Sequence, residues 1–508
     1  MSSVNTNMGA VVSAANMAKF GRELDTSIER LSSGLRINSA KDDAAGMAIV
    51  SKMEAQVRGV NQAIRNANDS QKLIDTSEGA HVETLNILQR LRELAVQASN
   101  DTNQALDRSF LNSEATQLIA EIDRIANQTT WNGEKILDGT FQSKQFQLGA
   151  NENEKVTYSI DSAKSSNIGN YKTTTGVARQ TVDAAPASGA GDANAVAADA
   201  AFVVTGYLGS NTLTIAQNSS AATVAGQING VTSETGVTAS AVTKASITLQ
   251  GAASIKFNLS NGTSSSAISV NISDNNDIRG LKNAINAVAG TTGITAEMSS
   301  NSKIILTHST GEDIYINSYD SSVEASTMTV MALDATGTTD LGTDASGTAA
   351  VLLDDVDASA DDAVSATRIT GQLDANSHEA FTVAVSNSDA TGFFSSANNS
   401  GGDNFVSSIS LGTAANAEAA ITVIDGAINK INQSRADLGA ISNRLDSTIS
   451  NLTNVATNVE GSMSNIRDAD FSIETSKLTR AQILTQAATS MLAQANTSKQ
   501  SILALLQG

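Results

Sequence analysis

Both ends of the chain repeat small and apolar residues at alternating steps of four and three. The positions are Ala14, Met17, Gly21, Leu24, Ile28 and Leu31 near the N-terminus, and Ala481, Leu484, Ala488, Met491, Ala495, Ser498, Ile502 and Leu505 near the C-terminus. A seven-residue repeat with a narrow seam is typical of a helix that packs against other helices. Small residues bury little apolar surface, so neither helix is expected to be stable alone.

Longer versions of this pattern lie further inside the chain. Residues 421–466 keep one register and would form a helix about 70 Å long at 1.5 Å per residue. The N-terminal counterpart runs from Val50 to Ile74 and resumes from Val82 to Val96 after Gly79. A shorter helix is predicted over 106–125. Three rods of similar pattern predict a bundle that joins distant parts of the chain.

The middle of the chain follows a different pattern. Residues 131–139 and 146–160 alternate around turn signals, which predicts β-hairpins. Residues 171–409 are rich in Ser, Thr, Ala, Gly, Asn and Asp, which predicts short strands and no long helix. An internal repeat has a constant offset of 57 residues, because Ile228-Asn229 recurs as Ile285-Asn286 and Gly236 recurs as Gly293. We interpret this as a duplicated strand–helix–strand unit.

These patterns predict an α+β multidomain protein: a discontinuous helical coiled-coil or bundle stalk built from both chain ends, with a β-rich outer insertion in the middle. Three regions are expected. Residues 1–40 and 466–508 form an inner terminal helical layer that is ordered on assembly. Residues 41–170 and 410–465 form a helical bundle domain with β-hairpins. Residues 171–409 form one or more variable outer domains, with the duplicated motif at about 205–320.

The stretch LSSGLRINSAKDDAAGMAIV (31–50) interrupts one helical pattern and starts another. Gly34 suits a helix C-terminus because glycine adopts the left-handed conformation freely. Ser39 and Asp42 have the spacing of a capping box. We interpret the stretch as a hinge between two helical layers, the inner of which a monomer cannot bury well. Many copies around an axis can bury it, so the sequence predicts a polymer with a seam at Met17, Leu24, Ile28, Leu31, Leu484, Met491, Ile502 and Leu505.

Composition excludes several classes of function. The 508 residues carry a formal net charge of -20, and a nucleic-acid partner would require clustered Lys and Arg. The absence of cysteine excludes disulfides, thiol catalysis and cysteinyl metal sites. The first twenty residues lack the features of a signal peptide, and no run approaches the roughly 20 apolar residues that span a bilayer. We therefore expect neither signal-peptide export nor membrane insertion.

No pattern indicates catalytic, cofactor-binding or metal-binding residues. HExxH, GxSxG and phosphate-binding loop motifs are absent. His81, His308 and His378 are scattered, and we expect them on the solvated surface. The acidic run DDVDASADD (354–362) could bind calcium, but it lacks the glycine and terminal glutamate of an EF-hand. The chain is therefore predicted to be neither an enzyme nor a cofactor-binding protein.

Several long motifs resemble those of bacterial flagellins. LSSGLRINSAKDDAAGMAI (31–49) resembles their N-terminal signature, and LGAISNRLDSTISNL (438–452), IRDADFSIETSKLTRAQIL (466–484) and SMLAQAN (490–496) resemble their C-terminal one. The resemblance implies an extracellular filament subunit for swimming motility, exported unfolded through the flagellar type III pathway. It also implies an export chaperone, a filament cap protein and a hook–filament junction protein as partners. Where flagellin tails often have a proline, this chain reads QANTSKQ, so the last helix is expected to run unbroken to Leu506.

The segment LQRLRELAVQASN (88–100) has two interpretations. Leu88, Leu91 and Val96 are expected to serve the bundle, with polar residues on the other side. In flagellins, a matching segment contacts the flagellin-sensing Toll-like receptor of animals and overlaps a filament contact. This resemblance suggests five receptor-contact candidates, which are Gln89, Arg90, Leu94, Gln97 and Glu114.

Two alternatives stay open at this point. A hook–filament junction protein shares terminal helices with flagellins, although not usually the full set of motifs. An extracellular adhesin or enzyme grafted into residues 171–409 would require a convergent group of polar residues, and the sequence shows none.

Overall fold

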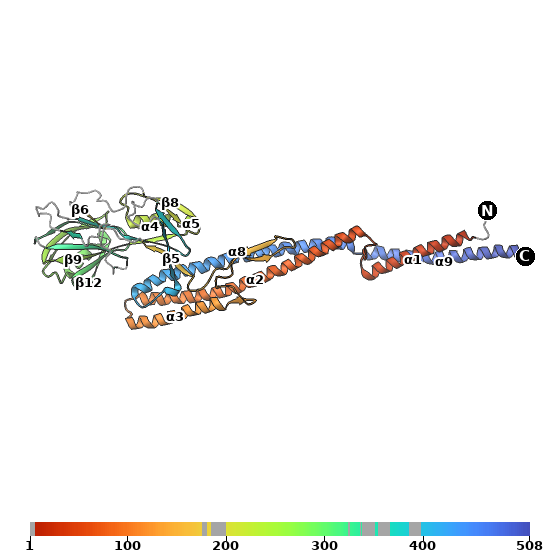
Figure 1. Cartoon of the computed structure of the whole chain (residues 1–508), viewed down its shortest axis with the longest axis horizontal. Coiled ribbons are helices and arrows are strands. Elements are labelled where there is room, and N and C mark those ends of the chain that lie inside the picture. Colours follow the sequence, from red (N-terminus) through yellow and green to blue (C-terminus); the bar gives the residue numbers. More distant parts are fainter. Residues whose placement is uncertain are drawn as a thin grey trace. The chain divides into compact units, whose positions relative to one another are not determined.

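The computed structural model describes residues 6–174, 180–183, 200–323, 326–335, 337, 351–353, 366–385 and 398–507 (Figure 1). Only the backbone is described for residues 174, 180–183, 200, 351–353, 385, 398–399 and 499–507. The chain divides into two compact units. The first unit contains Met1–Thr76, Gln142–Ser159 and Asp437–Gly508, and the second contains Ser77–Phe141 and Ile160–Ala436. The three regions predicted from the sequence remain a prediction.

Long helices occupy both ends of the chain, as predicted. They are α1 (Met8–Ser33), α2 (Ala44–Ser99), α3 (Ala105–Gln128), α8 (Ala414–Arg467) and α9 (Phe471–Gln507). The shorter helices between them are α4 (Ala221–Gly230), α5 (Thr232–Thr235), α6 (Arg279–Ala287), α7 (Ala289–Thr292) and the 3-10 turn η1 (Val406–Ser408). The last helix continues through the segment that lacks the usual proline, because no residue there removes a backbone donor.

Helices α2 and α8 run antiparallel, and polar contacts connect them along their length. Arg92 pairs with Asp425 at 2.7 Å, Arg435 with Glu78 at 2.7 Å, and Gln71 donates to Asp446. Helix α2 is continuous through Gly79, where the sequence pattern pauses. An internal glycine weakens a helix by only about 1 kcal/mol, so the surrounding packing decides.

The start of α2 differs from the prediction. Asp43, not Ser39, caps the helix, because its Oδ1 accepts from the amide of Gly46 at 2.9 Å. Asp42 instead closes a separate turn, where its carboxylate accepts from the amide of Ser39 at 2.8 Å. These hydrogen bonds lower the pKa of Asp42. The capping-box interpretation of Ser39 and Asp42 is therefore wrong, although both residues shape the hinge.

The described strands all lie between α3 and α8 in the sequence. They are β1 (Thr130–Trp131), β2 (Glu134–Lys135), β3 (Lys144–Gln147), β4 (Lys155–Tyr158), β5 (Gly169–Thr174), β6 (Gln180–Asp183), β7 (Ala200–Thr205), β8 (Ser210–Ile215), β9 (Thr238–Gln250), β10 (Ala253–Ser260) and β11 (Ser265–Ile272). They continue with β12 (Ile294–Ser300), β13 (Lys303–His308), β14 (Ile314–Ser321), β15 (Thr327–Leu333), β16 (Val351–Leu353), β17 (Ala366–Ile369), β18 (Gln372–Ser377), β19 (Thr382–Val385), β20 (Asn398–Ser400) and β21 (Gly402–Phe405). The β-rich insertion between helical ends is thus confirmed.

Two antiparallel hairpins accompany the helices, one from β1 and β2 and one from β3 and β4. In the first unit, the loop of the β3–β4 hairpin lies close to α2, since a Cβ at Gly59 would stand 2.8 Å from the Cβ of Ala150. In the same hairpin, the rings of Phe146 and Tyr158 stack with centroids 4.8 Å apart.

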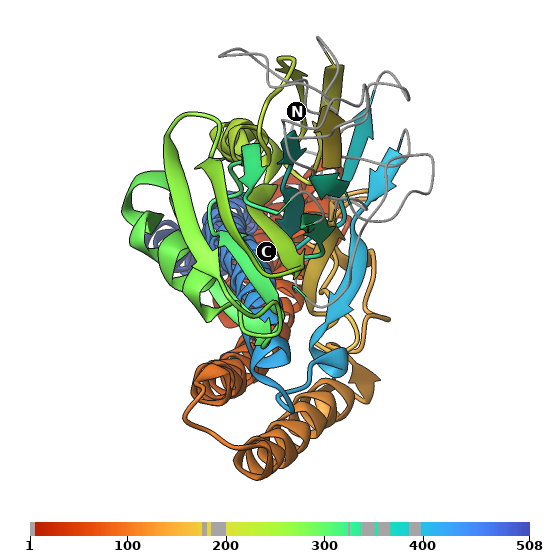
Figure 2. The ribbon, with the colours of Figure 1, turned by 90° about the vertical axis from the view of Figure 1, so that its left-hand side faces the viewer.

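Three larger antiparallel sheets form the insertion. One has the order β11-β10-β14-β17-β6, and one has the order β20-β19-β7-β8. The third has the order β12-β13-β9-β18-β5-β21, with β15 also paired with β9, and β16 paired with β15. Two apolar clusters fill them. The larger one includes Phe257, Leu259 and Tyr319, and the smaller one includes Phe202 and Phe381. Figure 2 shows α4 (yellow-green) and α6 (green) lying against the strands of these sheets.

The two copies of the internal repeat contain the same local structure. Gly236 and Gly293 both end a short helix with a φ of 75° and 72°. Asn229 accepts from the amide of Ala239 at 2.8 Å and donates to its carbonyl at 2.8 Å, and Asn286 brackets Ala296 in the same way. The asparagine in each copy ties a helix to the following strand, which explains why the pair Ile-Asn recurs.

Candidate functional site

The terminal helices α1 and α9 pack side by side in an antiparallel pair (Figure 1). Their seam is lined by small residues, among which Ala481 and Ala488 are buried. Large apolar side chains of the pair remain exposed. They are Met8, Val11, Val12, Ile28, Phe471, Ile473, Ile483 and Met491. An exposed apolar set of this size marks an interaction surface.

The predicted seam residues fall into three groups. Met17, Leu24, Leu31 and Leu484 are half-buried between the helices. Ile28 and Met491 are exposed, Met491 to 63%, and Leu492 is half-buried in the pair instead. The side chains of Ile502 and Leu505 lie outside the described residues. Within one chain, the pair therefore covers only part of the predicted seam.

A buried carboxylate crosses the seam. Glu474 on α9 is 5% exposed and accepts from Ser27 Oγ on α1 at 3.2 Å. Arg30 on α1 lies 3.7 Å from the same carboxylate, and Lys477 lies 3.0 Å from it. Near the chain ends, Asn7 donates to the carbonyl of Ala495 at 3.1 Å. The heptad pattern gives no sign of this polar crossing, because it ranks positions by apolar character.

The predicted hinge is paired with the turn between α8 and α9. Gly34 ends α1 with a φ of 72°, and its carbonyl accepts from the amide of Ala469 at 2.9 Å. The amide of Arg36 donates to the carbonyl of Arg467 at 2.6 Å. The two turning points of the chain are thus joined by backbone hydrogen bonds.

The segment around Arg90 forms an ion-pair cluster between α2 and α3. Arg90 donates to Glu114 at 2.9 Å and 3.1 Å and to Glu93 at 2.9 Å. The hydrogen bonds that Arg90 donates to Glu114 and, next in size, to Glu93 raise the pKa of Arg90. The guanidinium is half exposed and is held in one orientation by two carboxylates.

The structure places four of the five receptor-contact candidates at the surface. Gln89, Arg90, Gln97 and Glu114 are exposed, whereas Leu94 is fully buried. The expected bundle role of Val96 is wrong, since Val96 is 48% exposed and Leu94 packs inside with Leu88 and Leu91. Alternating steps of three and four through Leu88, Leu91, Ala95 and Ala98 keep the buried stripe on one face of the helix. Leu94 lies at the edge of this stripe, whereas Val96 points to the other side of the helix.

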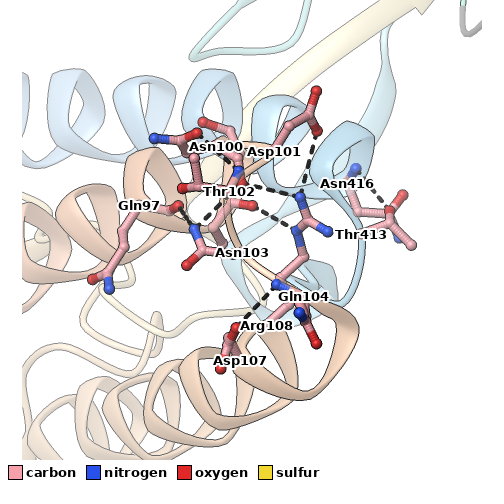
Figure 3. A network of polar contacts seen from close by, with 12 residues as sticks. Gln97, Asn100, Asp101, Thr102, Asn103, Gln104, Asp107, Arg108, Thr413 and Asn416 are labelled. Carbon is pink, nitrogen blue, oxygen red and sulfur yellow. Dashed lines mark hydrogen bonds and ion pairs between the residues drawn. The ribbon is translucent and has the colours of Figure 1, made fainter.

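The turn between α2 and α3 is held by one arginine (Figure 3). Arg108 donates to the carbonyl of Ala98 in the last turn of α2 at 2.8 Å. It also donates at 3.1 Å to the carbonyl of Asn100, just after the helix, which accepts from the amide of Asn103 as well. Asn103 adds a bond to the carbonyl of Gln97, and Asp107 accepts from the amide of Gln104 at 3.0 Å. This network fixes α3 against α2, and so sets Glu114 opposite Arg90.

The expectation that the three histidines are solvated is wrong. His81 is 1% exposed, His308 is also buried, and His378 is half-buried. Burial lowers the pKa of each ring, and that of His81 falls to about 4. A lone histidine in a polar stretch carries no sequence sign of burial. No group of three or more metal-ligating side chains occurs among the described residues, and the acidic run 354–362 lies outside them.

Comparison with known proteins decides the family. Models of the bacterial flagellin N-terminal and C-terminal helical regions match residues 4–142 and 421–506, and the flagellin hook IN motif matches residues 201–253 and 254–310. The B-type flagellin of Pseudomonas aeruginosa strain PAO1 is 34% identical over 507 residues, which cover 99% of both chains. The chain belongs to the bacterial flagellins.

Other flagellins agree over the same extent. The flagellin of Salmonella typhimurium strain LT2 is 34% identical over 532 aligned residues, and flagellin A of Helicobacter pylori strain 26695 is 31% identical over 529, with 99% of both chains covered in each case. As a flagellin, this chain is a structural, non-enzymatic subunit of the extracellular flagellar filament, and it polymerises with itself. In the described part of the chain, no helix has the length and hydropathy needed to cross a membrane.

Proposed function

We propose that α1 and α9 form the inner layer of the flagellin filament and become ordered on assembly. The observation that carries this proposal is the exposed apolar set on these two helices, Phe471 at 62% and Met491 at 63% included. Such surface is costly in water and is covered when copies pack around a common axis. The seam of small residues supports the proposal, because it stabilises the isolated pair weakly.

Electron microscopy combined with amide exchange tests this proposal. The purified protein should form long helical filaments. Amides of residues 8–33 and 471–507 should exchange fast in the monomer and slowly in the filament, since their protection comes from neighbouring copies. The amides of α2 should be slow in both states and serve as the internal control. Equal protection of the terminal helices in monomer and filament would contradict the proposal.

Export in an unfolded state through the flagellar type III pathway is the second part of the proposal. The composition supports it, since a chain with no cysteine, one proline and 3% aromatic residues forms few slow or stable traps in transit. The proposed partners are a flagellar export chaperone, a filament cap protein and a hook–filament junction protein, as the membership of the flagellin family suggests.

Recognition by the flagellin-sensing Toll-like receptor of animals is the third part. The surface around Arg90 supports it, because a guanidinium held by Glu93 and Glu114 is preorganised for a partner, and arginine is enriched among binding hot spots. Leu94 would contribute through packing of α2, since its side chain is buried.

The Arg90→Ala variant tests this part. It should leave the urea midpoint of the monomer nearly unchanged and weaken receptor activation in reporter cells by roughly tenfold or more. Arg124→Ala is the matched control, because Arg124 is equally exposed on α3 and pairs with Glu121. Undiminished signalling by Arg90→Ala would leave the segment as a filament contact only.

A further inference from the structure

His81 is a buried base without a polar partner. It lies on α2 in the second unit and is 1% exposed. Among the described residues, neither of its ring nitrogens has a hydrogen-bond partner, and the same holds for the hydroxyl of Ser77 one turn earlier. A buried polar group without a partner is costly, so its presence calls for an explanation.

An ion pair between two helices lies beside the ring. Arg435 on α8 donates to one oxygen of Glu78 on α2, at 2.8 Å from Nε and 2.7 Å from Nη2. Glu78 and Arg435 are the two charged groups that act on His81. A protonated His81 would have to share the carboxylate of Glu78 with Arg435, which repels the charged ring from the neighbouring helix.

We propose that His81 is an acid-sensitive weak point of the flagellin bundle, where protonation separates α2 from α8 at the Glu78–Arg435 pair. The proton would place a second cation beside a single carboxylate, on a ring that is itself buried although the ion pair is partly exposed. Local opening of the two helices relieves this, because it brings the charged ring into solvent. The bundle is then stable at neutral pH and loosens in acid.

The direction of the pH dependence follows from the two states of the ring. Burial, aided by Arg435 and opposed by Glu78, lowers the pKa of His81 to about 4, against an ordinary value of 6.5 in an unfolded chain. As the pH falls below 6.5, the unfolded or opened state binds the proton first. Stability is therefore complete above 6.5 and is lost progressively down to about 4.

The other two histidines have different surroundings. His308 has a partner in the hydroxyl of Thr310 at 3.2 Å and an acid, Glu312, that favours the charged ring. His378 is only half-buried, with Glu379 favouring the charged ring and Lys430 opposing it. All three rings have an acidic neighbour, and His81 differs in being the most deeply buried of them. Protonation is therefore opposed most strongly at His81.

Urea unfolding of the full-length monomer, followed by circular dichroism at 222 nm, tests the proposal between pH 7.5 and 5. The change is His81→Leu, which removes the titrating ring and keeps an apolar side chain of similar size. All carboxylates contribute to acid lability in both proteins. Across this range, the unfolding constant of the natural protein should rise about 30-fold more than that of His81→Leu.

Ser77→Ala is the matched control, because it removes the neighbouring unpartnered hydroxyl without removing a titrating group. Its stability should follow the pH in parallel with the natural protein. If His81→Leu also follows in parallel, the proposal is overturned.

A second measurement does not depend on the variant folding. The chain has three histidines, so carbon-13-labelled rings give few signals in NMR. The His81 signal should titrate near pH 4, and a midpoint near 6.5 would overturn the proposal.

His81→Met serves as a second apolar replacement for the urea experiment.

Discussion

The terminal helix pair and the β-rich insertion differ in how far they bury their large apolar residues. The insertion encloses Phe257, Leu259 and Tyr319 in its own core and leaves few large apolar residues exposed. The pair of α1 and α9 buries small residues and leaves Phe471 and Ile483 more than half exposed. One region completes its core within a single chain, and the other presents its apolar residues to further copies.

This difference shows where the sequence encodes the filament. The folding of the insertion depends on contacts within one chain, so its residues respond to packing alone. In the proposed assembly, the stability of the terminal helices depends on protein concentration, because other copies cover their apolar surface when they associate. The same type of residue therefore acts as core in one region and as interface in the other.

Removing residues 495–508 should have the largest effect on filament growth, because it shortens one helix of the terminal pair and leaves the insertion unchanged. The deletion shortens α9 and removes Ala495, whose carbonyl holds Asn7 of α1. We expect no filament growth from added filament seeds. The circular dichroism spectrum of the monomer should stay helical, because α2, α3 and α8 are unchanged. Growth at the rate of the full-length protein would show that the end of α9 contributes no essential contact.

Two single substitutions, one in the insertion and one in the terminal pair, test the same difference with smaller expected effects. Phe257→Ala should cost the monomer about 3–5 kcal/mol, because it empties a filled core, and should leave filament growth intact at low temperature. Ile483→Ala should change monomer stability by less than about 0.5 kcal/mol, because Ile483 is exposed, and should slow filament growth. Calorimetry of the monomers and light scattering during growth measure both effects. The distinction between core and interface fails if the two variants behave alike.

Much of the helical architecture could be predicted from the sequence. The spacing of apolar residues predicts all five long helices, and Gly34 predicts the end of α1 because the left-handed conformation there favours glycine. Helix positions depend on neighbours three and four residues away, so a local pattern contains the necessary information.

Other features depend on distant residues and could not be predicted. The burial of His81 depends on α8, more than 300 residues away, and the crossing of Glu474 to Ser27 depends on the register of α1 against α9. The burial of Leu94 instead of Val96 depends on which face of α2 packs against the rest of the bundle. The order of the strands within the sheets could not be predicted either, because β18 lies between β9 and β5, which are far apart in sequence.

The backbone joint between the hinge and the α8–α9 turn has a consequence for how the family can vary. Its bonds from Ala469 to Gly34 and from Arg36 to Arg467 use main-chain atoms, which every residue except proline supplies. The joint therefore constrains the number of residues between the helices more than their identity. Point substitutions there leave the bonds available, whereas one inserted residue in either connection would shift the donors past their acceptors and turn a helix face by about 100°.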